Sequence, residues 1–485
     1  MKRIIFIAIL AMAFLQGQAQ KETNLWYFGK NVGLNFNNLQ TKIATDASSV
    51  PNIPTMVKGP INTIEGCFTL SDGNGNLLMS SDGSTVYNAN NVVMHNGTGL
   101  LGNSSASQSG IVVPMPGNTD KYYIISVNAE SSSTGVNYSI VDMSQQGGLG
   151  SVITKNVNLL SGQRGENIMA IPNAANDAYW LIHRDRTTFY IWKITSVGIS
   201  FVGMTNFTAS LPTSNTTITV GYLTASPDYT KIAAVSLKNF SLVADFDNAT
   251  GAITNVKVRQ DINNVYKIEF SPSREWLIIA CNWDGGALYS IKLNDFISGG
   301  VMSTIYNERI SCIQKHTDGR MYGTGYNSDR ALFVIMNPDN GGTIVKKIAN
   351  FFSSDPQWGL PTFATGYLTL EGKEKSFVCT GNDFRYTVEV SMSGVSADQP
   401  TKLVWNFGDG SATVTQNIVS DQTIYKQIHN YATTGKYTIT IIPYKANGAA
   451  LSKITLPANV IDCVFKTNRM IRTDLQNTAT KAVNR

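Results

Sequence analysis

A turn followed by a short apolar strand recurs at nearly constant spacing along most of this chain. One residue can anchor each turn: Gly73, Gly117, Ala174, Pro227, Pro272 and Asp318. The successive spacings are 44, 57, 53, 45 and 46 residues. A period of roughly 40 to 50 residues with several short strands in each repeat is typical of β-propeller blades. We therefore predict a propeller over residues 24–370.

The segments between these turns have the composition of strands, and helical periodicity is scarce. Aromatic and β-branched residues bounded by Gly, Pro, Asn and Asp predict strands. Clear cases are KYYIISV at 121–127, AYWLIH at 178–183, FYIWKI at 189–194, EWLIIAC at 275–281 and ALFVIM at 331–336. The chain is therefore expected to be all-β.

The spacing also predicts how the ring closes. One period before Gly73 lies WYFG at 26–29, and one period after Asp318 lies PTF at 361–363. A blade built from both ends would complete a seven-bladed ring and remove its open sheet edge. We expect seven blades, with six or eight as alternatives. A pair of β-sandwiches is the competing architecture, because it also has short strands and frequent turns.

The pattern changes after the polar stretch EGKEK at 371–375, which reads as a linker. Apolar residues then alternate with polar ones in FRYTVEV at 384–390 and YTITI at 437–441, and Leu403, Trp405 and Phe407 share one face in LVWNF at 403–407. Alternation of this kind predicts an antiparallel sandwich. We place it at residues 376–463, so the predicted fold is a seven-bladed propeller followed by an immunoglobulin-like sandwich.

Two segments of the predicted sandwich carry a family resemblance. WNFGDGS at 405–411 and HNYATTGKYTITI at 429–441 resemble the polycystic kidney disease (PKD) domain. In that family the Gly408-Asp409-Gly410 segment is a structural turn, since glycine accepts backbone angles that other residues resist. A calcium loop would need further oxygen ligands at alternate positions, and the residues after Gly410 supply no carboxylate.

A wider resemblance covers most of the chain. NLWYFGKNVGLNFNN at 24–38, the run from EGCFTLSDGNG to VVPMPG at 65–117, and ENIMAIPNAANDAYWLIHRD at 166–185 resemble large surface proteins of Bacteroidota. In those proteins a propeller precedes PKD domains, and they are linked to type IX secretion and gliding motility. They usually end in a type IX sorting domain, whereas here the sandwich is followed by the short segment 464–485.

The first residues predict export. Lys2 and Arg3 precede an apolar stretch of 12 residues at 4–15, and GQA at 17–19 fits a cleavage site. This pattern is typical of a signal peptide, here residues 1–19, and the stretch is too short to span a bilayer. No other transmembrane segment is expected. The protein should be secreted and lie at the cell surface or on the outer membrane, with the periplasm as the alternative.

Charge argues against a nucleic-acid partner. The formal net charge is +5, of which Lys2 and Arg3 supply +2 and residues 464–485 supply +4, so the remainder is about −1. A nucleic-acid-binding domain carries its positive charge on a folded face. The basic tail at 464–485 is either a disordered end or a segment that docks and assembles the protein with partners.

The five cysteines are compatible with disulfides in an exported protein. Cys379 and Cys463 flank the sandwich strands, and we expect them to form a disulfide that joins its two ends. Cys281 and Cys312 lie one repeat apart and are a second, weaker candidate pair. Cys67 is then the odd cysteine, and we expect it to be a buried thiol.

No catalytic motif is present, and no metal or cofactor is expected. The chain has four histidines and no HExxH, GxSxG, paired CxxC or GxxxxGK[ST] pattern. The densest polar cluster is Arg164, Glu166, His183 and Asp185, in one predicted blade. Propellers bind ligands through such residues at the mouth of the channel. Internal ion pairing is the alternative interpretation.

Together these features favour an exported, non-enzymatic binding or scaffold protein of the cell envelope. Its propeller would recognise an envelope or surface protein or a glycan, and its sandwich would serve as a spacer or docking module. One alternative is a secreted polysaccharide or peptide hydrolase with the sandwich as an accessory domain. Another is a subunit of a filament or surface layer.

Overall fold

The structure is a computed structural model of the chain. It describes residues 21–130, 132–175, 177–208, 220–237, 240–261, 264–281, 286–325, 329–368, 378–379, 383–390, 399–419, 424–461 and 482–483. The predicted signal peptide at 1–19 and the polar linker at 371–375 lie outside these residues, as does most of the tail at 464–485.

Small antiparallel sheets follow one another along the first part of the chain. The first contains β1 (Leu25–Phe28), β2 (Lys30–Ile43) and β3 (Ser49–Asn62). The next contains β4 (Phe68–Ser71), β5 (Leu77–Ser81), β6 (Thr85–Asn88) and β7 (Val93–Thr98) and is joined to β8 (Gly110–Pro114), β9 (Lys121–Val127), β10 (Val136–Asp142) and β11 (Ser151–Leu160).

Four separate four-stranded sheets come next, each with its strands in chain order. They are β12 (Met169–Pro172), β13 (Tyr179–Asp185), β14 (Thr188–Thr195) and β15 (Gly198–Asn206); β16 (Leu223–Ala225), β17 (Lys231–Ser236), β18 (Phe240–Phe246) and β19 (Ile253–Arg259); β20 (Val265–Phe270), β21 (Trp276–Cys281), β22 (Leu288–Lys292) and β23 (Ser303–Tyr306); and β24 (Ile310–Lys315), β25 (Met321–Gly325), β26 (Leu332–Ile335) and β27 (Val345–Ile348). Helices among the described residues are short: α1 (Leu293–Ser298), η1 (Gln146–Gly148), η3 (Pro338–Asn340) and η4 (Thr365–Leu368).

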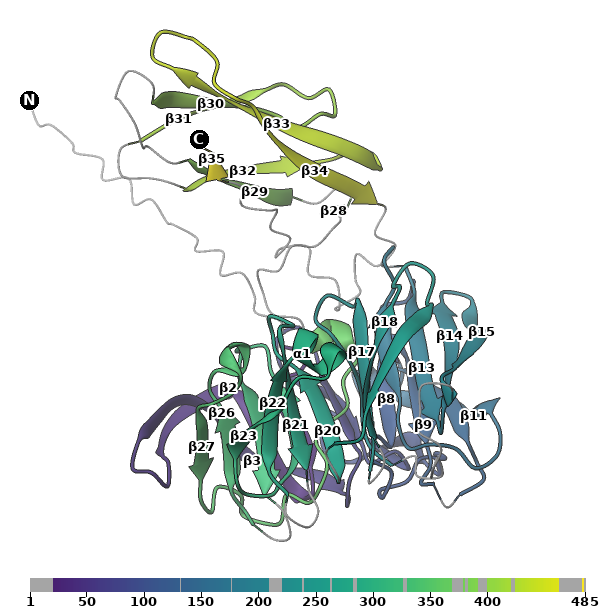
Figure 1. Cartoon of the computed structure of the whole chain (residues 1–485). Helices are drawn as coiled ribbons and strands as arrows, with labels where there is room; N and C mark the ends of the chain where they lie inside the picture. Colours follow the sequence, from purple (N-terminus) through teal and green to yellow (C-terminus); the bar gives the residue numbers. More distant parts are fainter. Residues whose placement is uncertain are drawn as a thin grey trace, which may run out of the picture.

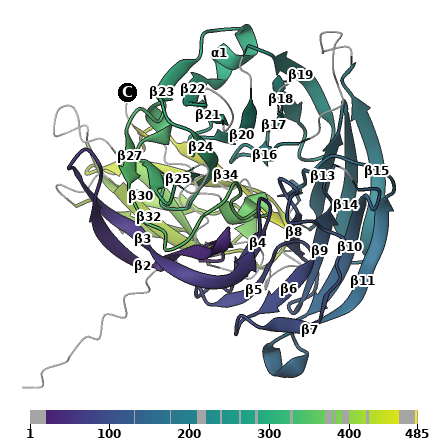
Figure 2. The ribbon, with the colours of Figure 1, turned by 90° about the horizontal axis from the view of Figure 1, so that it is seen from below.

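The sheets form a propeller-like ring (Figures 1 and 2). The first strands of successive sheets contact one another in the order β4, β8, β12, β16, β20 and β24. The last sheet also meets the first: the Thr45 amide donates to the Lys347 carbonyl at 2.9 Å, and Lys346 forms an ion pair with Asp46. Trp26 of β1 lies edge-on to Tyr322 of β25, with ring centroids 6.1 Å apart.

Burial changes from the inner to the outer strand of each sheet, which explains the residue types. All seven residues of β13 are buried, whereas the outer strand β15 is mostly exposed. Buried side chains from adjacent sheets pack face to face; for example, Trp180 of β13 and Phe246 of β18 share one cluster. This packing of neighbouring sheets accounts for the aromatic and β-branched composition of the inner strands.

The outer strands β7 and β11 pair with each other and so connect two sets of four strands. Among the described strands of the ring, no other neighbouring sets are connected by strand pairing. A single parallel bridge pairs His95 with Ser151. Side chains extend it: Asn96 donates to the Val152 carbonyl at 2.8 Å, and Lys155 donates to the Thr98 carbonyl at 2.7 Å. Asn156 donates to the Gly99 carbonyl at 2.8 Å. Side chains, more than a β ladder, therefore fasten these two strands.

The cysteine predictions have mixed outcomes. Cys281 and Cys312 are free thiols, so the expectation that they pair is wrong. Both are buried in strands of neighbouring sheets, and they belong to different hydrophobic clusters. Cys67 is a buried free thiol, as expected. The predicted partner of Cys379, Cys463, lies outside the described residues, so that disulfide stays a prediction.

The last part of the described chain forms two sheets that enclose a separate core. One contains β28 (Val378–Cys379), β34 (Ile454–Ile461), β33 (Gly435–Lys445), β30 (Pro400–Asn406) and β31 (Val414–Asn417). The other contains β32 (Ile424–Asn430), β29 (Asp383–Val390) and β35 (Ala482–Val483). Alternate residues meet between the sheets, among them Tyr386, Val388, Leu403, Trp405, Ile439 and Ile441.

Candidate functional site

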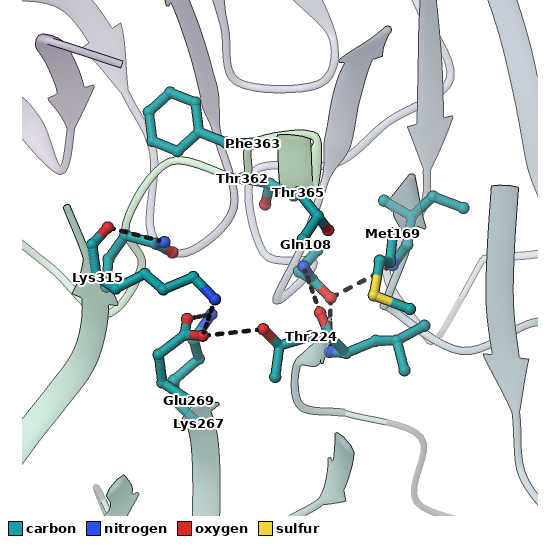
Figure 3. Close-up of a pocket in the computed structure, with 12 residues that line it drawn as sticks. Gln108, Met169, Thr224, Lys267, Glu269, Lys315, Thr362, Phe363 and Thr365 are labelled. Carbon is teal, nitrogen blue, oxygen red and sulfur yellow. Dashed lines mark hydrogen bonds and ion pairs between the residues drawn. The ribbon is translucent and has the colours of Figure 1, made fainter. Parts of the chain in front are cut away.

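The centre of the ring is lined by side chains from the first strands of four sheets, β12, β16, β20 and β24, together with Gln108 just before β8 and the segment after the last sheet. The lining residues are Gln108, Ile168, Met169, Leu223, Thr224, Lys267, Glu269, Gln314, Lys315, Thr362, Phe363 and Thr365. Figure 3 shows them converging on one small cavity. We call this the channel site.

Three charged side chains form the core of the channel site (Figure 3). Lys267 and Glu269 alternate on β20 and therefore lie on the same face of the strand. The Lys267 Nζ lies 3.5 Å from Glu269 Oε2, and the Nζ of Lys315, at the end of β24, lies 3.1 Å from Oε1. The three side chains are only 4%, 1% and 3% exposed in the order Lys267, Glu269, Lys315.

Four donors surround the carboxylate of this triad. Besides the two lysines, Glu269 Oε1 accepts from the Thr224 hydroxyl at 3.1 Å and from the Phe270 amide at 3.2 Å. Burial raises the pKa of Glu269, but the charges of Lys315 and Lys267 outweigh it and hold the pKa below its ordinary value. Glu269 is therefore ionised, and the triad carries two positive charges against one negative charge.

Gln108 connects two neighbouring sheets beside the triad. Its Oε1 accepts from the amides of Leu223 at 2.9 Å and Ile168 at 3.3 Å, and its Nε2 donates to the Leu223 carbonyl at 3.4 Å. The side chain thus bonds to the backbone of β16 and of the residue before β12. Its role is to hold two first strands together at the channel.

A second polar group contains two buried carboxyls around Ser107. Glu166 accepts from the Ser107 amide at 3.0 Å, the Ser107 hydroxyl at 3.1 Å and the Glu130 amide at 2.8 Å. Glu65 hydrogen-bonds Ser107 and accepts from the Tyr266 hydroxyl at 2.6 Å. We call this group the carboxyl pair.

The pKa values of the carboxyl pair are raised. Burial and the nearby charge of Glu166 raise the pKa of Glu65 to about 8, against the hydrogen bond from Tyr266, which lowers it. Burial also raises the pKa of Glu166, although the amides of Glu130 and Ser107 oppose the shift. Glu65 is therefore mostly protonated at neutral pH and carries little charge into the ring.

The structure gives the four residues that the sequence singles out different partners. Arg164 Nη1 lies 3.0 Å from Asp185 Oδ2, and Arg186 completes an ion-pair cluster at 3.2 Å. His183 donates through Nδ1 to the Asn167 carbonyl at 2.6 Å, and burial lowers its pKa to about 4. Glu166 instead belongs to the carboxyl pair. A ligand-binding role for these residues stays a prediction.

Sequence reasoning missed the residues that converge at the channel site. Lys267, Glu269 and Lys315 lie in segments that read as ordinary short strands, VYKIEF and ISCIQK. The available signal was a charged residue inside an otherwise apolar first strand. Charged groups are almost never fully buried unless they are paired, so strands with internal charges predict a network between repeats.

The Gly408-Asp409-Gly410 segment forms a turn after β30. Both glycines have positive φ, 80° and 85°. Asp409 accepts from the Ser411 amide at 3.1 Å and contacts His429 Nε2 at 2.7 Å, and the His429 ring stacks on Phe407 at 3.9 Å. Burial raises the pKa of Asp409, but the hydrogen bonds from Ser411 and His429 outweigh burial and lower the pKa to about 2.

The channel site has little free space. About 20 Å³ is open to the centre of a water molecule, enough for about one ordered water or a particle of similar size. Across the described part of the chain, no group of three or more His, Cys, Asp and Glu side chains is placed to hold a metal ion. The described residues contain no helix long and apolar enough to cross a membrane.

Comparisons with known proteins give weak likenesses. No protein-family model matches this sequence, and no curated protein matches it. A Bacteroides uniformis protein described as a candidate 6-phosphogluconolactonase is 9% identical, with a TM-score of 0.44 over 70% of this chain and 99% of the other. A Lactobacillus plantarum protein is 12% identical, with a TM-score of 0.37 over 82% and 96% of the two chains.

A third likeness involves the extracellular domain of a candidate one-component system of B. thetaiotaomicron. It is 11% identical, with a TM-score of 0.38 over 91% of this chain and 56% of the other. At these scores the likenesses carry no information about function, which must come from the geometry of the site.

Proposed function

We propose that the protein is an exported, non-enzymatic binding or scaffold protein of the bacterial cell envelope, built from a seven-bladed propeller and a PKD-type sandwich. The observation that carries the proposal is the small space at the centre of the ring. Most polar groups there bond to one another, and the space beside them admits about one water-sized particle, which gives little room for an organic substrate.

The blade count rests on how the sheets divide. β4–β7 and β8–β11 count as two blades because the single His95–Ser151 bridge is the only strand pairing between them among the described residues. With β1–β3 and the four separate sheets, this division gives seven. The segment at 361–363 adds no strand to β1–β3, so the blade expected from both chain ends takes its strands from the N-terminal end. This segment still lies against the ring, since the Thr362 amide donates to the Cys67 carbonyl at 2.8 Å and Phe363 packs near Trp26.

The PKD assignment rests on the turn and its histidine. The glycines adopt positive φ, Asp409 bonds within the turn, and His429 lies on Phe407 and contacts Asp409. These contacts link the two sequence segments on which the resemblance depends. They favour a structural role for the turn and agree with a sandwich that acts as spacer or docking module.

Recognition is assigned to the outside of the ring. β15 is the outer edge of its sheet and exposes Phe201, Val202 and Met204, at 55%, 50% and 65%. Exposed apolar residues on an unpaired strand edge suit contact with another protein or with the apolar face of a glycan. The proposed setting is the surface of a Bacteroidota cell, in adhesion, gliding motility or type IX secretion.

The test is crosslinking and pull-down from intact cells. It compares the full chain, a chain ending at Asp462, and a Phe201→Ser/Met204→Ser variant, with Lys257→Ser on the outer strand β19 as the matched control. Loss of the same partner in the β15 variant alone supports recognition by the ring. Loss only on truncation assigns docking to the basic tail.

Two outcomes would overturn the proposal in favour of its alternatives. Hydrolysis of polysaccharides or peptides by the purified protein, abolished by substitution in the ring, would identify a hydrolase. Growth of the purified protein into filaments or sheets without any partner would identify a structural subunit. Partner capture that none of the variants changes would show that the recognition surface lies elsewhere.

A further inference from the structure

We infer that the channel site binds one small monovalent anion of the halide class, beside the ammonium groups of Lys267 and Lys315 and the hydroxyl of Thr362. This inference goes beyond the proposed function and does not depend on which partner the ring recognises.

The first reason is charge. Glu269 is the carboxylate that pairs with both lysines, and the three side chains are at most 4% exposed. A buried charge without a counter-charge is costly, so the second ammonium needs compensation. Among the described residues, neither Glu65 nor Glu166 forms an ion pair with these lysines; Glu65 bonds Tyr266 and Ser107, and Glu166 bonds Ser107 and the Glu130 amide.

The second reason is an excess of donors. Lys315 Nζ has two partners besides the cavity, Glu269 at 3.1 Å and the Ala225 carbonyl at 3.3 Å. Lys267 Nζ has Glu269 at 3.5 Å and the Tyr222 ring, whose centroid lies 4.2 Å away. An ammonium group has three N–H donors, so each lysine retains one. Glu269 Oε1 already accepts from Lys315, the Thr224 hydroxyl and the Phe270 amide.

The third reason is an unpartnered hydroxyl. Thr362 Oγ1 is buried and has no hydrogen-bond partner among the described residues, and Thr362 lines the same cavity. In Figure 3 this threonine and the two lysines border one gap from different elements. A buried polar atom without a partner is uncommon, and a bound water or ion is one way to supply that partner.

The fourth reason is size. The centre of a water-sized sphere can move within about 20 Å³ of the cavity. This space suits one monatomic ion and is too small for sulfate, phosphate or a sugar. Donors converge on it from β20, from β24 and from the segment after β27. A halide accepts several such donors at once and supplies the missing negative charge.

The test measures the unfolding temperature of the full chain at fixed pH and ionic strength while sodium bromide replaces sodium gluconate. Bromide is expected to raise the unfolding temperature saturably, by about 2 °C or more, because it binds only the folded state. Lys315→Met leaves one ammonium against one carboxylate and should abolish this rise. Thr362→Val removes one donor and should weaken bromide binding severalfold.

Lys231→Met is the matched control, because Lys231 pairs with Asp245 outside the channel site and its removal should leave the bromide effect intact. Crystals grown in bromide locate the ion directly, even if a channel variant fails to fold. An anomalous peak between Lys267, Lys315 and Thr362 supports the inference. A water in that position without an anomalous peak, or an equal bromide effect in Lys315→Met, overturns it.

Discussion

The ring and the sandwich shift the pKa of a buried or partly buried carboxyl group in opposite directions. Glu65 in the ring is buried beside Glu166, and its pKa rises to about 8. Asp409 in the sandwich lies in a turn with Ser411 and His429, and its pKa falls to about 2. Burial dominates in the first case and local hydrogen bonds dominate in the second. The two regions should therefore lose stability at opposite ends of the pH range.

The largest effect on stability is expected at Glu269, because its carboxylate pairs with the buried side chains of Lys267 and Lys315. Glu269→Met leaves two buried ammonium groups without a carboxylate and should lower the free energy of unfolding by about 3–5 kcal/mol. Urea denaturation measures it. Replacing Lys267, Glu269 and Lys315 together by methionine is the control, since it removes the charges as a set. A near-native Glu269→Met variant would contradict the role of the triad.

The next effect is the pH dependence from Glu65. The pKa of Glu65 is about 8 in the folded protein and 4.5 ordinarily. Protonated Glu65 therefore adds its full share to the free energy of unfolding below about pH 4.5, and this share is lost as pH rises through about 8. The Glu65→Gln side chain stays neutral at every pH. The free energy of unfolding of this variant should therefore fall by about 2–4 kcal/mol less across this pH range than that of the natural chain. Unfolding by urea across that window tests it. Glu308→Gln, in an exposed ion pair, should leave the slope unchanged.

The turn of the sandwich offers a matched pair of glycine substitutions. A Cβ at Gly408 would lie 2.6 Å from the Thr438 carbonyl oxygen, whereas a Cβ at Gly410 meets nothing within 4 Å. Both positions have positive φ, so alanine strains both, but only Gly408→Ala adds a clash. We expect a cost of about 2 kcal/mol at Gly408 and about 1 kcal/mol at Gly410. Equal costs would show that the strand contact is unimportant.

The smallest effect is expected from Asp409→Asn. The folded pKa of about 2 lies below the ordinary 3.8, so its contribution is present above about pH 3.8 and is lost as pH falls through about 2. The substitution should cost about 1 kcal/mol at neutral pH after solvent screening and should flatten the acid limb. Thermal unfolding from pH 2 to pH 7 measures both. A loss of calcium affinity in a folded variant would instead indicate a binding loop.

Periodicity carried much of the prediction of the fold, because each repeat must bury its own inner strands against its neighbours. The turn anchors at Pro227, Pro272 and Asp318 each separate the first two strands of a sheet. The same reasoning failed for Cys281 and Cys312, since spacing by one repeat says nothing of where two side chains point. Cysteines on neighbouring strands are able to pack in different hydrophobic layers, as these do.

The candidate site was harder to predict, because its residues come from separate repeats. Arg164 and Asp185 attract notice as charges close in sequence, and they form a local ion pair. Lys267 and Lys315 lie one repeat apart in sequence and meet only when their two neighbouring sheets pack together. Their contact depends on which face of each first strand points inward, and the bulges in β20 and β24 shift that register. A single sequence does not reveal such bulges.

The contacts between β7 and β11 affect the order in which the sheets of the ring separate during unfolding. Most neighbouring sheets touch mainly through side chains packed face to face. At this joint, Lys155 and Asn156 reach the backbone of the adjacent strand and its loop. We expect residues 68–160 to open as one cooperative unit, so hydrogen exchange should report a single protection class there and put the first opening at another seam.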